Sequence, residues 1–195
     1  MRAQARIVFF VFVSILALGE ARAIAEDEGP FRLTSDAFAE GALIPTDHTC
    51  DGADRSPTLQ WSGAPAGTQA FTLIVDDPDA PGGSFTHWIL YNVPGAAKGL
   101  AEGMPPGKTT LGDGSLQGKS DFKRPGWGGP CPPKGSKHRY EFELYALSAP
   151  LELEPGVTRD EVEKAMKDTT LAKTKLTGQY ARPTAAKPTP TPPKP

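Results

Sequence analysis

Two short polar stretches of the chain carry the side chains best suited to chemistry. The first spans residues 76–81 (DDPDAP) and is followed by His87, and the second spans residues 129–140 (GPCPPKGSKHRY). Aspartate and histidine exchange protons and hydrogen bonds with charged ligands, and Gly/Pro loops can aim backbone N–H groups at an oxyanion. Both stretches lie at the end of an apolar run, where a β scaffold usually builds a binding site. Together they predict one anion-accepting pocket and no obvious reaction.

Each stretch taken alone also has a purely structural interpretation. The turn at residues 77–79 can satisfy its carboxylates with local backbone N–H groups, and turn statistics favour that interpretation. His87 lies at the start of an apolar run, where a histidine is often a satisfied structural residue. In the second stretch, His138 could donate to an anion, while Arg139 could brace a loop through a bidentate contact with a carboxylate.

Short strands joined by turns must position these loops. The chain contains 21 Pro and 21 Gly, which favours many turns and little helix. One helix is expected at 159–168, because Thr158 and Glu161 form a capping box ahead of an apolar stripe. Apolar or alternating runs predict strands at 31–33, 59–61, 70–75, 87–93, 140–147 and 171–180. This pattern indicates a mainly β fold with two sheets.

The N-terminal residues 1–23 have the pattern of a secretory signal peptide. Arg2 and Arg6 precede an apolar run at 7–18, and small residues suitable for cleavage follow at 21–25. The run is shorter than the roughly 20 residues that cross a bilayer, so an uncleaved anchor is the alternative. The signal predicts a bacterial protein exported to the periplasm or beyond, with no transmembrane anchor after cleavage.

Charge and composition narrow the class of partner and the domain plan. The full chain has 21 Lys and Arg against 23 Asp and Glu. Removing residues 1–23 takes away three arginines and one glutamate, which leaves 18 basic and 22 acidic residues, a formal charge of −4. Because this charge is acidic and no basic cluster exists, nucleic acid is not an expected partner. We expect one domain at 24–182 and a disordered Pro-rich tail at 183–195.

Two cysteines, Cys50 and Cys131, are present in the chain. An even pair in an oxidising compartment favours a disulfide, which at this loop length would contribute roughly 4–5 kcal/mol in the loop-entropy model. The alternative is two free thiols near the pocket. Sequence spacing does not decide between them, because it does not show how closely the two Cα atoms approach.

Taken in order, these motifs resemble the phosphatidylethanolamine-binding protein family, in its bacterial Raf-kinase-inhibitor-like branch. The resemblance covers about residues 31–182, nearly the whole mature domain. It rests on the ordered set Cys50-Asp51-Gly52, Ser56-Pro57, Asp77-Pro78-Asp79-Ala80-Pro81, His87-Trp88, Gly129-Pro130-Cys131-Pro132-Pro133 and His138-Arg139-Tyr140. The resemblance implies two antiparallel sheets in a Greek-key sandwich, with a C-terminal helix near a small pocket.

The resemblance also implies a ligand and the residues that hold it. Family members bind phosphate-like anions and phospholipid head groups. By motif position, the ligand-binding residues are Asp77, His87, Pro132, His138 and Tyr140. Two imidazoles and the loop N–H groups can bind a phosphate monoanion, while the carboxylate orients one histidine or meets a ligand ammonium.

Two positions depart from the family pattern. His48 stands where many bacterial relatives have a tyrosine, and Thr169 falls where many carry a histidine beside the late helix. The helix-side wall of the pocket, and with it the ligand preference, is therefore open. His48 also raises a zinc alternative, with Asp77 or a free cysteine completing the ligand set. Because close ligand spacing is missing, we expect no metal and no cofactor.

Three functions are compatible with these residues. The first is an exported protein that binds a small anion or phospholipid head group, with a regulatory role as one variant. The second is a protein-interaction module that inhibits a protease or another exported partner. The third is a hydrolase that uses the same His/Asp pocket, with Ser84 or Ser136 nearby in sequence. Because the chain lacks a Gly-x-Ser-x-Gly elbow, we do not expect an enzyme.

Overall fold

The computed structural model describes residues 29–184. The expected signal peptide at 1–23 and residues 185–195 of the expected tail lie outside this range. The elements in chain order are β1 (Arg32–Thr34), the 3-10 helix η1 (Thr46–His48), β2 (Leu59–Ser62), β3 (Ala70–Asp77), β4 (Phe85–Pro94), β5 (Gly99–Leu100), β6 (Leu116–Gln117), β7 (Lys137–Leu147), α1 (Arg159–Met166) and β8 (Thr170–Ala181). None of the helices within residues 29–184 is long and apolar enough to cross a membrane.

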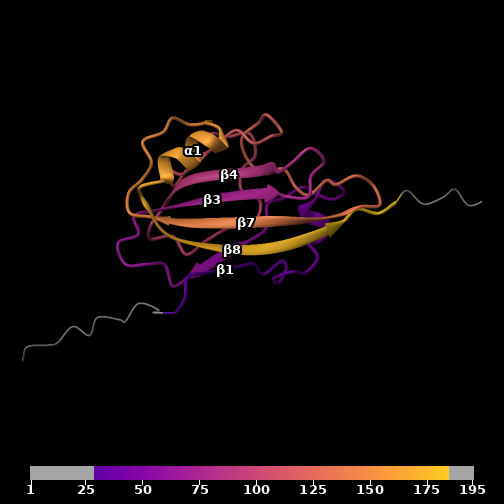
Figure 1. The fold of residues 1–195 in the computed structure, drawn as a ribbon, viewed down its shortest axis with the longest axis horizontal. Helices are drawn as coiled ribbons and strands as arrows, with labels where there is room; N and C mark the ends of the chain where they lie inside the picture. The colour runs from indigo at the N-terminus through magenta and orange to yellow at the C-terminus, as the bar shows by residue number, and fades with distance from the viewer. Residues whose placement is uncertain (1–28, 185–195) are drawn as a thin grey trace, which may run out of the picture.

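Two antiparallel sheets make up the fold, which confirms the predicted two-sheet β architecture. The larger sheet has the order β6-β4-β3-β7-β8, and the smaller has the order β1-β2-β5. Figure 1 shows α1 next to β4 and β1 next to β8. The helix predicted at 159–168 ends two residues earlier, at Met166. The strand predicted at 140–147 starts three residues earlier, at Lys137, because β7 pairs with β8 over its full length.

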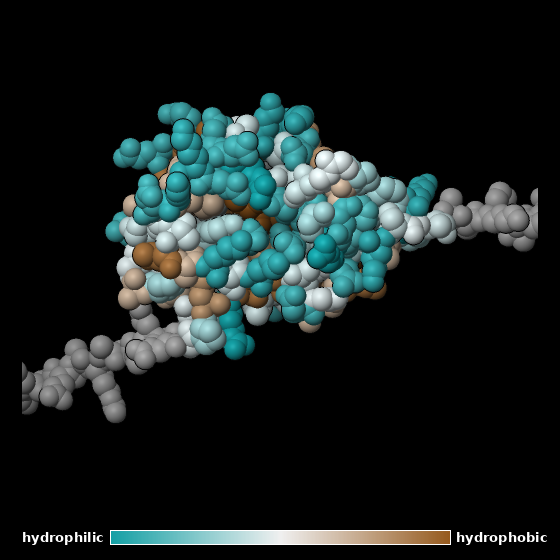
Figure 2. All heavy atoms as spheres, viewed as in Figure 1, coloured by the Kyte–Doolittle hydropathy of each residue, from teal (hydrophilic) through white to brown (hydrophobic). Residues whose placement is uncertain are grey.

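Alternation along the central strands gives the large sheet two buried faces. Leu73 and Val75 of β3 point into the core between the sheets, together with Trp88 of β4 and Phe142 of β7. Ile74 joins the opposite cluster, which α1 covers. Burying side chains of this size stabilises the fold by about 1.5–3 kcal/mol each. The outside seen in Figure 2 is mainly hydrophilic with small scattered hydrophobic patches, since most large apolar side chains lie within these two clusters.

A β-bulge interrupts the pairing of β3 with β4 next to the predicted pocket. Val75 pairs with Trp88, whereas Asp76 pairs with Thr86, so His87 is an extra residue without a partner on β3. Strict alternation from Trp88 would turn His87 toward α1. The bulge instead directs the His87 ring to the side of Trp88, where it packs on Tyr140. Bulges of this kind re-aim single side chains, often beside functional sites.

Candidate anion-binding site

The centre of the site is a buried pair formed by Asp77 and His138. Asp77 ends β3 and His138 lies near the start of the antiparallel β7, so the two strands bring them together. The Asp77 Oδ2 and His138 Nδ1 atoms are 2.7 Å apart, and the residues are only 4% and 7% exposed. A carboxylate only accepts hydrogen bonds, so the His138 Nδ1–H donates. This tautomer leaves Nε2 for other contacts.

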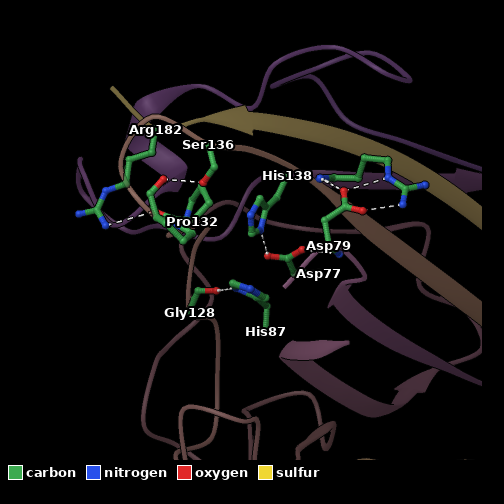
Figure 3. A network of polar contacts seen from close by, with 10 residues as sticks. Asp77, Asp79, His87, Gly128, Pro132, Ser136, His138 and Arg182 are labelled. Carbon is green, nitrogen blue, oxygen red and sulfur yellow. Dashed lines mark hydrogen bonds and ion pairs between the residues drawn. The ribbon is translucent and has the colours of Figure 1, made fainter. Parts of the chain in front are cut away.

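His87 makes the matching arrangement with the backbone. Its Nδ1 lies 2.6 Å from the carbonyl oxygen of Gly128, which can only accept a hydrogen bond, so Nδ1–H again donates. Burial is the main influence on this ring and lowers its pKa, although the Gly128 carbonyl and the Asp77 charge act in the other direction. The imidazole is therefore neutral at pH 7, and its Nε2 carries a lone pair. Figure 3 shows His87 and His138 close together with Asp77 beside them.

Tyr140 packs against His87 but does not line the cavity. Its ring is fully buried and packs edge-on against His87, with 5.2 Å between the ring centroids. Burial and, after it, the nearby Asp77 charge raise the pKa of the Tyr140 hydroxyl, so the phenol stays protonated. The hydroxyl makes no hydrogen bond of good geometry within residues 29–184, although Asp77 is close enough to influence it electrostatically.

These groups surround a small cavity of about 170 Å³. It is lined by Asp77, Ala80, Pro81, Phe85, His87, Phe122, Cys131, Pro132, Pro133 and His138. Four of the five predicted site residues thus line one cavity, and the fifth, Tyr140, packs against His87. Larger hollows of about 550 and 520 Å³ occur elsewhere on the molecule, so chemistry and not size distinguishes this site.

The Gly/Pro loop that forms one wall is tied down at several points. A disulfide joins Cys50 to Cys131 with 5.4 Å between their Cα atoms, so the expected bond is present and the free-thiol alternative is wrong. Next to it, the Gly129 N–H donates to Asp54 Oδ1 at 2.7 Å, and the Cys50 N–H donates to the Pro130 carbonyl at 3.1 Å. These contacts hold the backbone of the wall in place before any ligand arrives.

An exposed ion pair between Arg139 and Asp79 braces the DPDAP turn, which forms another wall of the cavity. Arg139 donates to Asp79 from its backbone N–H, Nε and Nη2, at 2.9, 2.9 and 2.6 Å. These bonds lower the pKa of Asp79 to about 2. Arg139 was predicted to brace a loop through a carboxylate, and that carboxylate is Asp79. Asp79 belongs to the same DPDAP turn as Asp77. Because the pair is exposed, we expect it to fix the turn more than to stabilise the fold.

His48 and the helix contribute nothing to this cavity. His48 is buried in η1, where its Nδ1 lies 2.9 Å from the Arg55 carbonyl. Residues 29–184 contain no group of three or more His, Cys, Asp or Glu that could hold a metal ion, and the disulfide removes both sulfurs from the zinc alternative. The expected helix-side wall is corrected: Val162 and Met166 of α1 pack on the other face of the large sheet.

The functional groups of the cavity lining are two imidazoles and one carboxylate. Among the described residues that line it, none carries a hydroxyl or a free thiol. Ser84 lines the separate 550 Å³ hollow, and Ser136 donates its hydroxyl to the Pro133 carbonyl at 2.6 Å. The arrangement instead presents two imidazole Nε2 atoms beside one carboxylate. Such a set can bind a phosphate-like anion once a proton sits on a ring or on the ligand.

Sequence reasoning missed two aromatic lining residues, Phe85 and Phe122. Phe85 precedes His87 by two positions on β4, so the side-chain alternation of a strand could have suggested it. Phe122 comes from a segment rich in Gly and Pro, and no periodicity marks it.

Comparisons with known proteins identify relatives of this chain. Residues 34–181 match the model of the family described as phosphatidylethanolamine-binding protein. A UPF0098 protein of Methanothermobacter thermautotrophicus is 45% identical over 150 residues, which cover 77% of this chain and 98% of that protein. A candidate lipoprotein of Mycobacterium tuberculosis, LppC, is 38% identical over 152 residues, covering 77% and 72% of the two chains.

A solved structure supports the same relationship. The crystal structure of Escherichia coli YbcL, described as a member of the mammalian PEBP family, superposes with a TM-score of 0.72 at 33% identity. The match covers 78% of this chain and 99% of that one, so the similarity extends over the whole two-sheet domain.

Proposed function

Because the chain belongs to the phosphatidylethanolamine-binding protein family, we propose that its 170 Å³ cavity binds a small phosphate-type anion, either free or as a phospholipid head group, and does not convert it chemically. The observation that carries the proposal is the pair of histidines whose Nδ1 atoms are already engaged, one by Asp77 and one by Gly128. Each ring is therefore fixed in orientation, with its Nε2 left over.

The charge balance of the site supports an anion that arrives with a proton. Asp77 compensates His138 when that ring is protonated, so a bound monoanion would meet a positive Nε2–H held against a buried carboxylate. At His87, the neutral ring can accept a hydrogen bond from a protonated phosphate oxygen. A dianion without a proton would face a lone pair at His87 and a buried carboxylate at Asp77, which disfavours it.

The compartment is a further part of the proposal. The signal-like residues 1–23 and the disulfide between Cys50 and Cys131 both favour an exported protein. The relative named a candidate lipoprotein is in keeping with export. The ligand would then be a phosphate-type anion available outside the cytoplasm.

The three histidines of the chain allow a test with an internal control. His87 and His138 line the cavity, whereas His48 is buried in η1 away from the lining. We would titrate the mature protein with inorganic phosphate and follow the side-chain ¹⁵N resonances of all three rings by NMR. We expect the Nε2 signals of His87 and His138 to shift with one saturation curve while those of His48 stay in place.

Two outcomes would overturn the proposal. In one, no histidine resonance changes up to high phosphate concentration. In the other, His48 moves as much as the cavity histidines, which would indicate a general effect of the anion on the fold. His138→Ala should remove the saturable response of His87, and Ser84→Ala, outside the cavity, should leave it intact.

A further inference from the structure

The cavity is polar on one side and apolar on the other. Asp77, His87 and His138 form its polar part. The mouth is formed by apolar side chains, those of Ala80, Pro81, Phe85, Phe122 and Pro133 among them. A phosphate-type anion uses only the polar part, which leaves the apolar mouth without a role in binding the anion itself.

The volume of the cavity points in the same direction. At about 30 Å³ for each water molecule in the liquid, the 170 Å³ cavity corresponds to roughly five or six waters. This is more room than one compact tetrahedral anion requires. The remaining space adjoins the rings of Phe85 and Phe122, so a ligand that carries an apolar group beyond the phosphate would fill it.

Phe122 is held in the cavity by a tight turn. The Asp121 N–H donates to the Thr86 carbonyl at 3.0 Å, and the Thr86 N–H donates back to Asp121 Oδ2 at 2.8 Å, so the turn is fixed to the start of β4. Lys123, at φ 62°, closes the turn through its N–H bond to the Ser120 carbonyl at 2.9 Å. These bonds fix the backbone on both sides of Phe122 before a ligand binds.

The Phe122 ring is in contact with the polar part of the site. Its centroid lies 4.9 Å from that of Phe85 and 5.2 Å from that of His87, both edge-on. It also packs directly on the backbone of Gly128, the residue whose carbonyl fixes His87, and a Cβ at that position would collide with the ring. A guanidinium, that of Arg124, lies 5.6 Å from the ring centroid.

Despite these contacts Phe122 remains 37% exposed. It is one of three exposed large hydrophobic side chains in the described part of the chain, and the other two, Leu43 and Leu171, do not line this cavity. An exposed aromatic ring fixed at the mouth of a small polar site offers a preformed surface for an apolar ligand group.

We propose that Phe122 is a specificity-determining residue that makes the site prefer phosphate monoesters with an apolar substituent over free phosphate and over polar esters such as phosphoethanolamine. This inference rests on the proposed function, because it presupposes that the phosphate group binds at the histidines. The apolar substituent packs on Phe122 and Phe85, and the phosphate oxygens face His87 and His138. An aromatic substituent gains most, since edge contacts between rings add to the burial of apolar surface.

Calorimetric titration with four soluble ligands tests the proposal: inorganic phosphate, phosphoethanolamine, butyl phosphate and phenyl phosphate. For the wild-type protein we expect phenyl phosphate to bind about tenfold more tightly than phosphate, with butyl phosphate between them and phosphoethanolamine close to phosphate. In Phe122→Ala the ratio of the affinity for phenyl phosphate to the affinity for inorganic phosphate should fall to about twofold. Phe122→Leu should retain the preference for butyl phosphate.

Leu171→Ala is the matched control, because it also removes an exposed large apolar side chain, one that lies at the start of β8 and does not line the cavity. It should leave all four affinities unchanged. The inference is overturned if Phe122→Ala keeps the preference for phenyl phosphate, or if it weakens phosphate and phenyl phosphate equally. If the wild-type protein binds phosphate without any preference, the inference alone fails, whereas if it binds none of the four ligands, the proposed function fails as well.

Discussion

Two consecutive aspartates at the end of β3 lie in different environments on opposite faces of the large sheet. Asp76, on the face that α1 covers, accepts a hydrogen bond from Thr86 Oγ1 at 2.8 Å and forms an ion pair with Arg159 Nη2 at 2.9 Å. Asp77, on the other face, is bonded to the ring of His138. Both are buried, at 6% and 4% exposure. Burial of a carboxylate therefore does not by itself distinguish a residue of the proposed site from a structural one.

The two carboxylates differ in the kind of partner that each one has. Arg159 Nη2 forms ion pairs with both Asp76 and Glu163, at 2.9 and 3.0 Å, so this atom is shared between two carboxylates. Burial, the largest influence, raises the pKa of Asp76, which marks a carboxylate held at a cost in solvation. The His138 ring uses Nδ1 for Asp77 and keeps Nε2 for a ligand. The two faces therefore differ in the group beside the carboxylate: an imidazole that lines the small cavity next to Asp77, and a guanidinium nitrogen shared by two carboxylates next to Asp76.

Removal of the disulfide is expected to change stability most. The disulfide lies beside the cavity that Asp77 lines. Cys50 and Cys131 are 81 residues apart, so the Cys50→Ser/Cys131→Ser double variant should lower the free energy of unfolding by about 4 kcal/mol. Phosphate affinity should fall too, because Cys131, Pro132 and Pro133 form one wall. Urea denaturation and calorimetry measure the two effects, and reduction of the wild-type protein should reproduce both. A loss of stability below about 1 kcal/mol would contradict this expectation.

Arg159→Met tests the role of Asp76, the aspartate on the face that α1 covers. It leaves the Asp76 carboxylate buried with only Thr86 as a side-chain partner, which we expect to cost about 2 kcal/mol of unfolding free energy. This value is below the usual one for a broken buried pair, because the Arg159 side chain is 33% exposed. Phosphate binding should stay within about twofold. Thermal unfolding gives the first quantity and calorimetry the second, and a large loss of binding would show that the two faces are coupled.

The pH dependence of binding tests the neutral state of His87. Because burial lowers the pKa of His87, the ring is unprotonated near pH 7, and anion binding then requires a proton on the ligand or on an imidazole. Binding should therefore take up protons, and phosphate affinity should rise by about threefold to tenfold between pH 8 and pH 6. Calorimetry in buffers of different ionisation enthalpy measures the uptake directly. Proton release on binding would contradict the neutral state of His87.

The exposed pair of Asp79 and Arg139 gives the smallest effect. Arg139→Lys removes the fork that holds the DPDAP turn, but surface ion pairs contribute only about 0–1 kcal/mol to stability. We expect unchanged thermal unfolding within that range and a loss of phosphate affinity of about twofold to threefold, because the turn also carries Asp77. Lys175→Ala, which removes another exposed pair, with Glu141, serves as the control and should not change binding.

The sequence predicted the long elements and the members of the site more reliably than it predicted their geometry. The strands around residues 70–75, 87–93 and 140–147 are confirmed because their apolar pattern agrees with burial on two sides of a sheet. Asp77, His87, Pro132 and His138 line one cavity, in agreement with the motif order. Side chains from separate loops meet because antiparallel pairing places the end of β3 beside the start of β7.

The remaining features depend on tertiary structure that no local pattern encodes. The bulge at His87 shifts the alternation of side chains along β4 by one residue. In a regular strand of the same sequence, the His87 ring would point toward α1. The helix was expected beside the pocket, yet its apolar stripe packs on the opposite face through Val162 and Met166. Phe122 enters the cavity through a turn whose bonds to Thr86 span residues far apart in sequence.

Calorimetric titration of Asp77→Asn and Asp76→Asn with inorganic phosphate tests the contrast between the two aspartates most directly. The variants change neighbouring residues by the same near-isosteric substitution on opposite faces of one strand. We predict that Asp77→Asn loses roughly tenfold or more in affinity, because the His138 ring then loses the carboxylate that accepts its Nδ1–H, while Asp76→Asn stays within about twofold of the wild-type protein. Equal losses in both variants, or a loss confined to Asp76→Asn, would contradict the assignment of the site to the Asp77 face.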